Sequence, residues 1–383
     1  MSELSYLEKL LDGVEVEWLP LSGLARIRNG KDHKSLSEGE FPVYGSGGIM
    51  RYVDTYAYNK PSVLIPRKGS LGNLFFVNVP FWTVDTIFYT EIDEAQIRPK
   101  YLYYFLTTVG LGEMNQAGGV PSQTQSVLNK LKIPIPCPDN PEKSLAIQSE
   151  IVRILDKFTA LTAELTAELN MRKKQYNYYR DQLLSFKDGE VEWKTLGEVA
   201  QYSKTRISFE LLDERNYVGV DNLLQNRAGK SLSNHVPTSG KLTEFIPNDI
   251  LIGNIRPYLK KIWQADCIGG TNGDVLVIRC IDSSINTRYL YQILADDKFF
   301  EYNMQHAKGA KMPRGSKEDI MKYPIPVPPL TLQARIVEIL NKFDTLTNSI
   351  TEGLPREIEL RQKQYEYYRD LLFSFPKPET ASN

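Results

Sequence analysis

Two stretches of the chain, 144–186 and 330–375, carry the same alternation of apolar and polar residues. In the first stretch, side chains that are apolar except for Arg172 recur at steps of four and three residues, which is the a/d seam of a coiled-coil helix. Ser144 is a suitable N-cap, and no glycine or proline follows before Phe186, so we predict one helix roughly 60 Å long. The seam consists of Ile147, Ile151, Ile154, Phe158, Leu161, Leu165, Leu169, Arg172, Tyr176, Tyr179 and Leu183.

The second stretch is a copy of the first with one insertion. The copies align at a shift of 185 residues at Ile151/Ile336 and of 189 residues at Lys174/Lys363, so four residues are inserted around Pro355. Four residues are close to one helical turn, which a coiled coil absorbs as a stutter, and the proline is expected to kink or break the helix. The matching seams predict that the two copies pair in antiparallel orientation.

The repeat extends beyond the helices. GVEVEWLPLSGLA at 13–25 returns as GEVEWKTLGEVA at 189–200, and KYLYYFL at 100–106 returns as RYLYQIL at 288–294. Two core helices of one α-rich protein would not explain these matches. The repeating unit is therefore a whole domain plus a helix, about 185 residues in all, used twice.

Short β-rich runs separated by glycine and proline turns fill the segment between the first residues and the first long helix. We expect a hairpin with a glycine turn at 41–56, a strand, a basic turn and a second strand at 61–79, one strand at 81–92 and a short helix at 98–114. The segment before the second long helix follows the same plan. The predicted fold class is α+β, with two α/β domains containing mixed twisted sheets, separated by two long helices.

These patterns divide the chain into six parts. The leucines at the N-terminus lie on one side of a short amphipathic helix, which either packs on the first domain or docks a partner subunit. The parts are an N-terminal helix at 1–12, a first domain at 13–143, a first long helix at 144–186, a second domain at 187–329, a second long helix at 330–375 and a flexible tail at 376–383.

Bulk composition narrows the possible functions. The 383 residues suffice for two domains with cores, and the formal net charge is −1. That charge counts mildly against a stand-alone nucleic-acid binder, unless basic residues cluster or a partner shares the polyanion. Three cysteines without ligand spacing predict reduced thiols in a cytoplasmic protein, and we expect neither a signal peptide nor a membrane span.

No set of residues in the sequence predicts catalysis by this chain. Ala228-Gly229-Lys230-Ser231 matches a phosphate loop only weakly, because Leu224 stands where the loop needs glycine. The glycines at 45–48 suit a hairpin turn, and the three histidines lack metal-ligand spacing. The Asn/Asp-Pro-Pro-aromatic motif of an adenine methyltransferase is absent from the sequence. We therefore expect the chain to position chemistry that is carried out elsewhere.

Basic and amide side chains alternate with tyrosines and glycines in loops of both domains. Arginine and lysine contact phosphates or guanine edges, and asparagine reads adenine. Each of these residues alone is more readily explained as a solvated surface charge, but the set on paired domains favours DNA binding. The candidates are Lys31, Tyr44, Arg51, Arg67, Lys68 and Asn73 in the first domain, and Lys204, Arg206, Asn254, Arg256, Lys260, Lys308, Lys311 and Arg314 in the second.

Three long motifs resemble one family over nearly the whole chain. They are LLDGVEVEWLPL at 10–21 and the two long helical stretches. The first stretch ends in YYRDQLLSF and the second in YYRDLLFSF. The chain resembles the specificity subunits of type I restriction-modification enzymes, and within them the IC group. YGSGG at 44–48, LIPRKGSLGN at 64–73 and the proline-rich ends of both domains match more loosely.

The resemblance implies a division of labour. Each domain would read one half of a split target on double-stranded DNA, and the helices would form an antiparallel coiled coil that sets the gap. Two modification subunits would carry S-adenosylmethionine and methylate adenine at N6, and restriction subunits would use ATP and Mg for translocation and cleavage. No cofactor or metal is expected on this chain. Partner contacts are expected on exposed helix faces at Arg180, Asp181, Arg369 and Asp370, with capping or inter-helix ion pairs as the alternative.

The repeated tetrapeptide TAEL at 162–169 lies in the middle of the first long helix. In the family that the chain resembles, the number of copies sets the spacer of the target. Two other functions are kept as alternatives: a coiled-coil scaffold that does not contact DNA, and an autonomous enzyme, which the missing motifs disfavour.

Overall fold

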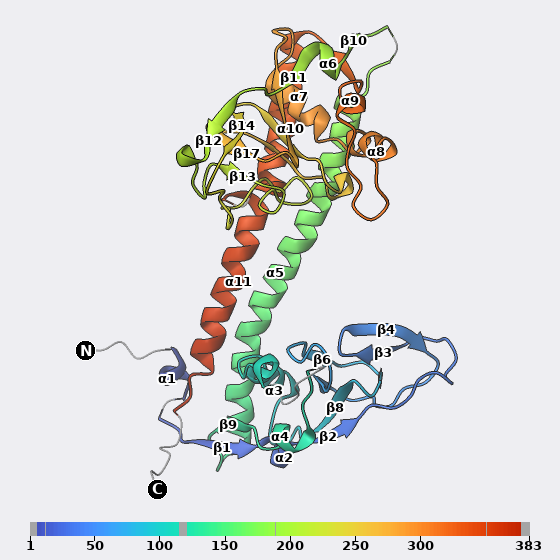
Figure 1. Cartoon of the computed structure of the whole chain (residues 1–383). Helices are drawn as coiled ribbons and strands as arrows, with labels where there is room; N and C mark the ends of the chain where they lie inside the picture. The colour runs from blue at the N-terminus through green and yellow to red at the C-terminus, as the bar shows by residue number, and fades with distance from the viewer. Residues whose placement is uncertain (1–5, 12, 115–120, 188, 350, 377–383) are drawn as a thin grey trace, which may run out of the picture. The chain divides into compact units, whose positions relative to one another are not determined.

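The computed structural model describes residues 6–11, 13–114, 121–187, 189–349 and 351–376 (Figure 1). The chain divides into two compact units, one comprising Met1–Thr162 with Arg361–Asn383 and the other Ala163–Leu360. Both boundaries lie within long helices, α5 (Pro141–Leu183) and α11 (Gly353–Leu372). Each unit therefore contains one domain and a part of each of these helices.

The domain of the first unit is built on two small sheets. One is antiparallel with the strand order β2-β8-β5-β6, and the other has the order β4-β3-β7 with a parallel β3–β7 pair, so the domain is mixed. The strands are β2 (Ala25–Asn29), β3 (Phe41–Gly45), β4 (Gly48–Val53), β5 (Ser62–Pro66), β6 (Phe75–Val77), β7 (Trp82–Thr83) and β8 (Ile87–Ile92). A separate antiparallel pair joins β1 (Val16–Pro20) to β9 (Lys132–Pro136). The helices are α1 (Tyr6–Leu11), α2 (Leu21–Leu24), α3 (Pro99–Leu106), the 3₁₀ turn η1 (Leu111–Glu113) and α4 (Gln125–Leu128).

The hairpin expected at 41–56 is confirmed as β3 and β4, and the short helix expected at 98–114 is α3 followed by η1. The single strand expected at 81–92 is wrong. That segment is two strands in different sheets, β7 and β8, with a turn between them. Val84 N donates to Tyr44 O of β3 in the mixed sheet, and Thr86 O accepts from Arg67 N, which follows β5 of the antiparallel sheet. The sequence conceals this turn because Val84-Asp85-Thr86 contains neither glycine nor proline, so the β-rich run reads as continuous.

The domain of the second unit repeats this architecture (Figure 1). Its antiparallel sheet has the order β11-β18-β15-β16, and its mixed sheet has the order β12-β14-β17-β13. The strands are β10 (Glu192–Thr195), β11 (Ala200–Tyr202), β12 (Arg206–Ser208), β13 (Tyr217–Val218), β14 (Lys241–Phe245), β15 (Ile250–Gly253), β16 (Ile262–Gln264), β17 (Gly269–Thr271), β18 (Val275–Cys280) and β19 (Pro324–Val327). The helical elements are α6 (Leu196–Val199), η2 (Phe209–Leu211), η3 (Pro257–Leu259), α7 (Thr287–Leu294), α8 (Asp297–Gln305) and α9 (Lys317–Ile320). The predicted α+β fold with an internal repeat is confirmed.

A fully buried glutamine ties each domain to its long helix. In the first unit, Gln148 Oε1 accepts from Arg98 N at 2.8 Å, and its Nε2 donates to Gln96 O at 3.0 Å. In the second unit, Gln333 of α10 makes the same two bonds, from Asn286 N at 2.8 Å and to Ser284 O at 2.8 Å. The duplicated bonds hold the segment before α3 or α7 against the helix.

Helix α5 begins earlier than predicted. Its N-cap is Asn140, whose side chain accepts from Lys143 N at 3.1 Å, and Pro141 occupies the first turn, where its missing N–H is not needed. Ser144 is therefore not the cap. It is buried inside the helix, and its hydroxyl bonds to Gln148 Nε2 at 3.2 Å.

The second long stretch consists of two helices, α10 (Leu330–Asn348) and α11. Between them Ser349 Oγ accepts from Glu352 N at 3.2 Å. Gly353 has φ +79°, and a Cβ there would lie 2.4 Å from Thr345 O, so this tight turn requires glycine. The expected break near Pro355 is confirmed, and the proline itself lies in the first turn of α11.

Aromatic stacking joins the long helices within each unit. In the first unit, Phe158 of α5 stacks on Tyr368 of α11 with ring centroids 5.3 Å apart. In the second, Tyr176 of α5 stacks on Phe343 of α10 at 5.8 Å. Among the described residues, no helix has the length and apolar character needed to cross a bilayer.

Candidate nucleic-acid interface

Two loops of the second domain are locked together by main-chain hydrogen bonds. Arg256 N donates to Pro313 O at 2.7 Å, and Gly315 N donates to Asn254 O at 3.1 Å. The first loop follows the buried strand β15, and the second precedes α9. We call these segments, 254–256 and 313–315, the paired loops of the second domain.

The first domain contains the same arrangement. Gly69 N donates to Pro121 O at 2.9 Å, and Gln123 N donates to Arg67 O at 3.0 Å. The spacing within each loop is identical in the two domains, so Gly69 is the counterpart of Arg256 and Pro121 the counterpart of Pro313. Segments 67–69 and 121–123 are therefore the paired loops of the first domain. The sequence indicated candidates in 67–69 but none in 121–123, and it did not show that the two segments pair.

Four predicted DNA-binding residues gather on or beside the paired loops of the second domain. Lys308 and Arg314 exchange two main-chain bonds, of 2.9 and 2.8 Å, and so close a small hairpin with Lys311 at its exposed tip. Arg256 is also exposed. Arg314 Nη1 bonds to Asp274 Oδ1 at 2.7 Å, which fixes the direction of that guanidinium. The cluster presents an excess of positive charge to solvent.

Two other predicted residues of the second domain are held by the domain itself. Asn254 is only 5 % exposed, because the segment continues from the buried strand β15, so its side chain is not placed to read a base, and on this point the expectation is wrong. Lys260 Nζ bonds to Asp297 Oδ1 at 2.7 Å, but its side chain stays partly exposed, so its contact with DNA stays a prediction.

Lys204 and Arg206 lie elsewhere on the second domain. Arg206 begins strand β12, and its Nη1 donates to Thr243 Oγ1 at 3.1 Å on the neighbouring strand β14. Both side chains are exposed. Among the described residues, neither contacts the paired loops, so the structure does not bring them into that cluster.

Three predicted residues of the first domain lie around its glycine turn. Asn73 Nδ2 donates to Ser46 O at 3.2 Å. Lys68 lies 3.8 Å from Asp85, and the Arg67 guanidinium lies 5.9 Å from the centre of the Phe88 ring. The segment 69–73 therefore lies against the turn at 45–48.

The remaining three candidates of the first domain differ in availability. Tyr44 is half-buried against Phe75 and Phe81, and burial raises the pKa of its hydroxyl. Arg51 Nη2 donates to Leu36 O at 3.0 Å. Lys31 is exposed. Tyr44 thus contributes to the core of the domain, whereas Lys31 is free to meet a ligand.

Comparison with known proteins gives a consistent result. The model of the type I restriction modification DNA specificity domain matches residues 14–172 and again 189–360. The EcoR124I/EcoR124II specificity subunit of Escherichia coli is 45% identical over 409 aligned positions, covering 100% of both chains. The EcoprrI specificity subunit of Escherichia coli is 35% identical, covering 92% of this chain and 93% of its own. A type I restriction-modification S subunit from M. genitalium has the same fold, with a TM-score of 0.61, 15% identity and coverage of 98% and 99%.

This chain belongs to the type I restriction-modification specificity family. The resemblance drawn from the helical motifs, including that to the IC group, is thereby confirmed. The two matched segments correspond to the two domains, each with part of its long helix.

The partner-contact residues predicted for this specificity subunit divide into buried and exposed ones. Arg180 is only 2 % exposed and lies over the Tyr176 ring at 4.1 Å, so its expected place on an exposed helix face is wrong. Asp181 bonds to Lys298 at 3.2 Å within the second unit. Arg369 and Asp370 bond to each other at 2.8 Å, and Asp370 is exposed. Intramolecular ion pairs thus account for three of these four residues.

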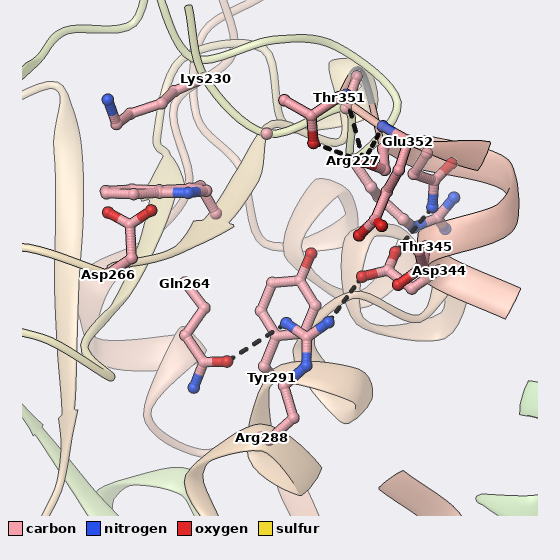
Figure 2. Close-up of a pocket in the computed structure, with 15 residues that line it drawn as sticks. Arg227, Lys230, Gln264, Asp266, Arg288, Tyr291, Asp344, Thr345, Thr351 and Glu352 are labelled. Carbon is pink, nitrogen blue, oxygen red and sulfur yellow. Dashed lines mark hydrogen bonds and ion pairs between the residues drawn. The ribbon is translucent and has the colours of Figure 1, made fainter. Parts of the chain in front are cut away.

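A polar cavity of about 400 Å³ lies in the second unit beside the break between α10 and α11. Figure 2 shows Arg288 alongside Tyr291, reaching Asp344 at 2.6 Å and Gln264 at 3.3 Å. Lys230, of the weak phosphate-loop motif, lies 5.1 Å from the Trp263 ring and donates to Arg215 O. Acidic and basic residues are equally numerous in the lining, so the cavity does not favour a phosphate ligand.

Two residues beside the paired loops of the second domain were missed from the sequence. Tyr258 is 50% exposed on the 3₁₀ turn η3, and Met312 is 50% exposed next to Pro313. Both lie in stretches from which only basic and amide residues were predicted to bind DNA. A large apolar residue within a basic, glycine- and proline-containing loop indicates an exposed apolar side chain, and this pattern could have identified both residues.

Proposed function

We propose that this chain is the DNA-reading subunit of a restriction-modification complex, with each domain recognising one half of a bipartite target. The observation that carries the proposal is the duplicated pair of loops, built from equivalent main-chain bonds in both domains. The main-chain hydrogen bonds hold each pair of loops in a fixed conformation, whereas the side chains on the loops differ between the two domains. Two frames with different side chains suit two different half-sites.

The long helices support a spacing role. Helix α5 runs through the boundary between the units at Thr162/Ala163, inside the TAEL repeat. A helix resists bending over this length far better than a loop, so it suits a fixed gap between half-sites. Stacked aromatic pairs with α10 and α11 reinforce it in each unit.

The catalytic steps are proposed to belong to partner subunits. Two modification subunits would hold S-adenosylmethionine and transfer its methyl group to adenine N6, and restriction subunits would use ATP and Mg. The near-neutral net charge of −1 supports a shared interface, because a chain that bound DNA alone would need a stronger basic excess. The exposed helix positions Asp181 and Asp370 remain proposed contacts for these partners.

The experiment is methylome sequencing of cells that express this chain with its modification subunits. Wild type should yield one bipartite methylated motif. Arg256→Ala with Arg314→Ala should relax or abolish one half of the motif, and Arg67→Ala with Lys68→Ala the other half. Lys342→Ala, on the exposed face of α10 beside Glu338, is the control and should leave the motif unchanged. A scaffold without DNA readout would give the same motif for every variant.

A further inference from the structure

A short turn in the second domain carries an unusual backbone. Arg256 and Lys260 flank η3 and have φ angles of +53° and +50°, a left-handed region that disfavours residues with a Cβ. Tyr258 lies between them with half of its surface exposed. Strained backbone of this kind persists only where surrounding contacts hold it, and it concentrates at binding sites.

A second strained segment supports this turn. Asn226 and Arg227 have φ angles of +54° and +63°. Asn226 N donates to Leu259 O at 2.9 Å, and Arg227 N donates to Lys260 O at 2.9 Å. The two segments therefore hold each other in place through their main chains.

One carboxylate joins both segments to the core of the domain. Asp297 Oδ1, at the first residue of α8, accepts from Lys260 Nζ at 2.7 Å and forms an ion pair with Arg227 Nη2. Helix α8 is anchored by the buried rings of Phe299 and Phe300. Asp297 thus connects an exposed turn to a rigid element.

The other end of the turn is held by the paired loops. Arg256 N donates to Pro313 O at 2.7 Å, and Ile255 pairs with Arg314. The turn is consequently fixed on both sides, beside the exposed cations Arg256 and Arg314. Within the described part of the chain, no hydrogen bond or ring contact occupies the Tyr258 side chain.

We propose that Tyr258 inserts its ring into a groove of the DNA duplex as a sequence-reading contact, and that Asp297 is the residue that positions it. The proposal rests on the DNA recognition proposed above. An exposed aromatic ring between cations matches a duplex groove, where phosphates flank apolar base and sugar surfaces. Because the backbone of this turn is already fixed before DNA binds, the tyrosine loses little conformational freedom on binding.

The test uses the complex with its modification subunits and a duplex carrying the methylated motif found by sequencing. Tyr258→Ala should weaken discrimination between this duplex and single-base variants of one half-site by about tenfold. The other half-site should be read as before. The salt dependence of binding should stay the same, because tyrosine neutralises no phosphate, whereas Arg314→Ala should lower its slope by about one.

Asp297→Asn should cause the same loss at the same base position, and this loss should vanish in a Tyr258→Ala background. Lys260→Met should act in the same direction. Asp282→Asn is the matched control, because it removes an aspartate bonded to Lys194 in the same domain, away from the turn. Melting temperatures of the Asp297 and Lys260 variants that stay well above the temperature of the binding assay would separate loss of positioning from unfolding.

Two results would overturn the inference: a Tyr258→Ala complex that still reads every base of both half-sites as wild type does, or additive effects of the Tyr258 and Asp297 changes. Failure of the proposed function is distinct from either, because the wild-type complex itself would then show no preference for the duplex.

Discussion

Gln333 of α10 accepts a hydrogen bond from the main-chain N–H of Asn286 at 2.8 Å, and the equivalent bond in the other unit joins Gln148 to Arg98. Gln333 Nε2 also donates to Ser284 O and Pro328 O, both at 2.8 Å. The side chain is completely buried, so none of these groups has water as a substitute.

Gln333→Leu should therefore lower the free energy of unfolding by about 3 kcal/mol, because it leaves several buried polar groups without partners. Thermal unfolding of the purified chain is the measurement. Gln182→Leu, at an exposed position of α5, is the control and should change stability by less than about 0.5 kcal/mol. Equal effects of the two substitutions would show that the buried amide does not fasten the domain to its helix.

Insertion of a third TAEL after Leu169 should lengthen the non-specific spacer of the target and leave both half-sites unchanged. Four helical residues add about 6 Å, and DNA rises about 3.4 Å per base pair, so the gap should grow by about one or two base pairs. Methylome sequencing of the variant provides the answer. Altered half-sites with an unchanged gap would contradict the spacing role, and a four-residue insertion in the loop at 234–239 is a control that leaves α5 intact.

The Asp297 carboxylate should make stability depend on acid pH. Burial alone would raise its pKa, but the bonds from Lys260 and Arg227 outweigh burial and lower the pKa of Asp297 from its usual value. A depressed native pKa contributes stability that is complete above the unfolded value, near pH 4, and is lost as pH falls through the native value. The stability difference between wild type and Asp297→Asn should accordingly shrink below about pH 4, as measured by urea unfolding. A difference that stays constant down to pH 3 would contradict the ion-pair assignment.

The buried guanidinium of Arg180 has too few hydrogen-bond partners to offset the free energy that its removal from water costs. Its Nη1 approaches Ala295 O at 3.4 Å, while Nε and Nη2 have no hydrogen-bond partner among the described residues. Arg180→Met keeps the packing over Tyr176 and removes the charge, so it should leave stability unchanged or raise it by about 1 kcal/mol. Arg180→Ala leaves a cavity and should lower stability by about 2 kcal/mol. Calorimetric melting of both variants tests this order, and the reverse order would mean that the guanidinium stabilises the native chain.

The sequence predicted those features of the fold that depend on periodicity and repetition. The seam from Ile147 to Leu183 requires a long helix whatever surrounds it, and the duplicated motifs require two similar domains. Ser144 was misassigned because a serine before an apolar run satisfies the rule for a cap, whereas its burial depends on Gln148 and the domain packed there. The strand expected at 81–92 was divided for a similar reason, since only the tertiary fold places Val84 in one sheet and Thr86 against another.

The candidate site was only partly predictable because the sequence does not show whether a basic side chain is exposed to solvent or paired with a carboxylate. Lys260 and Arg256 are close in sequence, yet Lys260 is held by Asp297, 37 positions further on, while Arg256 is exposed. Asn254 was misjudged because it adjoins a buried strand whose end is not marked in the sequence. Pairing between segments such as 254–256 and 313–315 arises from main-chain atoms, which carry no residue-specific signal.

The same main-chain pairing has an evolutionary consequence. Because N–H and C=O groups tie residues 256 and 69 to residues 313 and 121, replacement of the side chains at 255, 256 or 314 leaves those ties intact. Arg256 occupies the place that Gly69 holds in the other domain, which demonstrates this tolerance within a single molecule. If these side chains read DNA as proposed, point substitutions would shift the preferred bases of one half-site in small steps without rebuilding a domain.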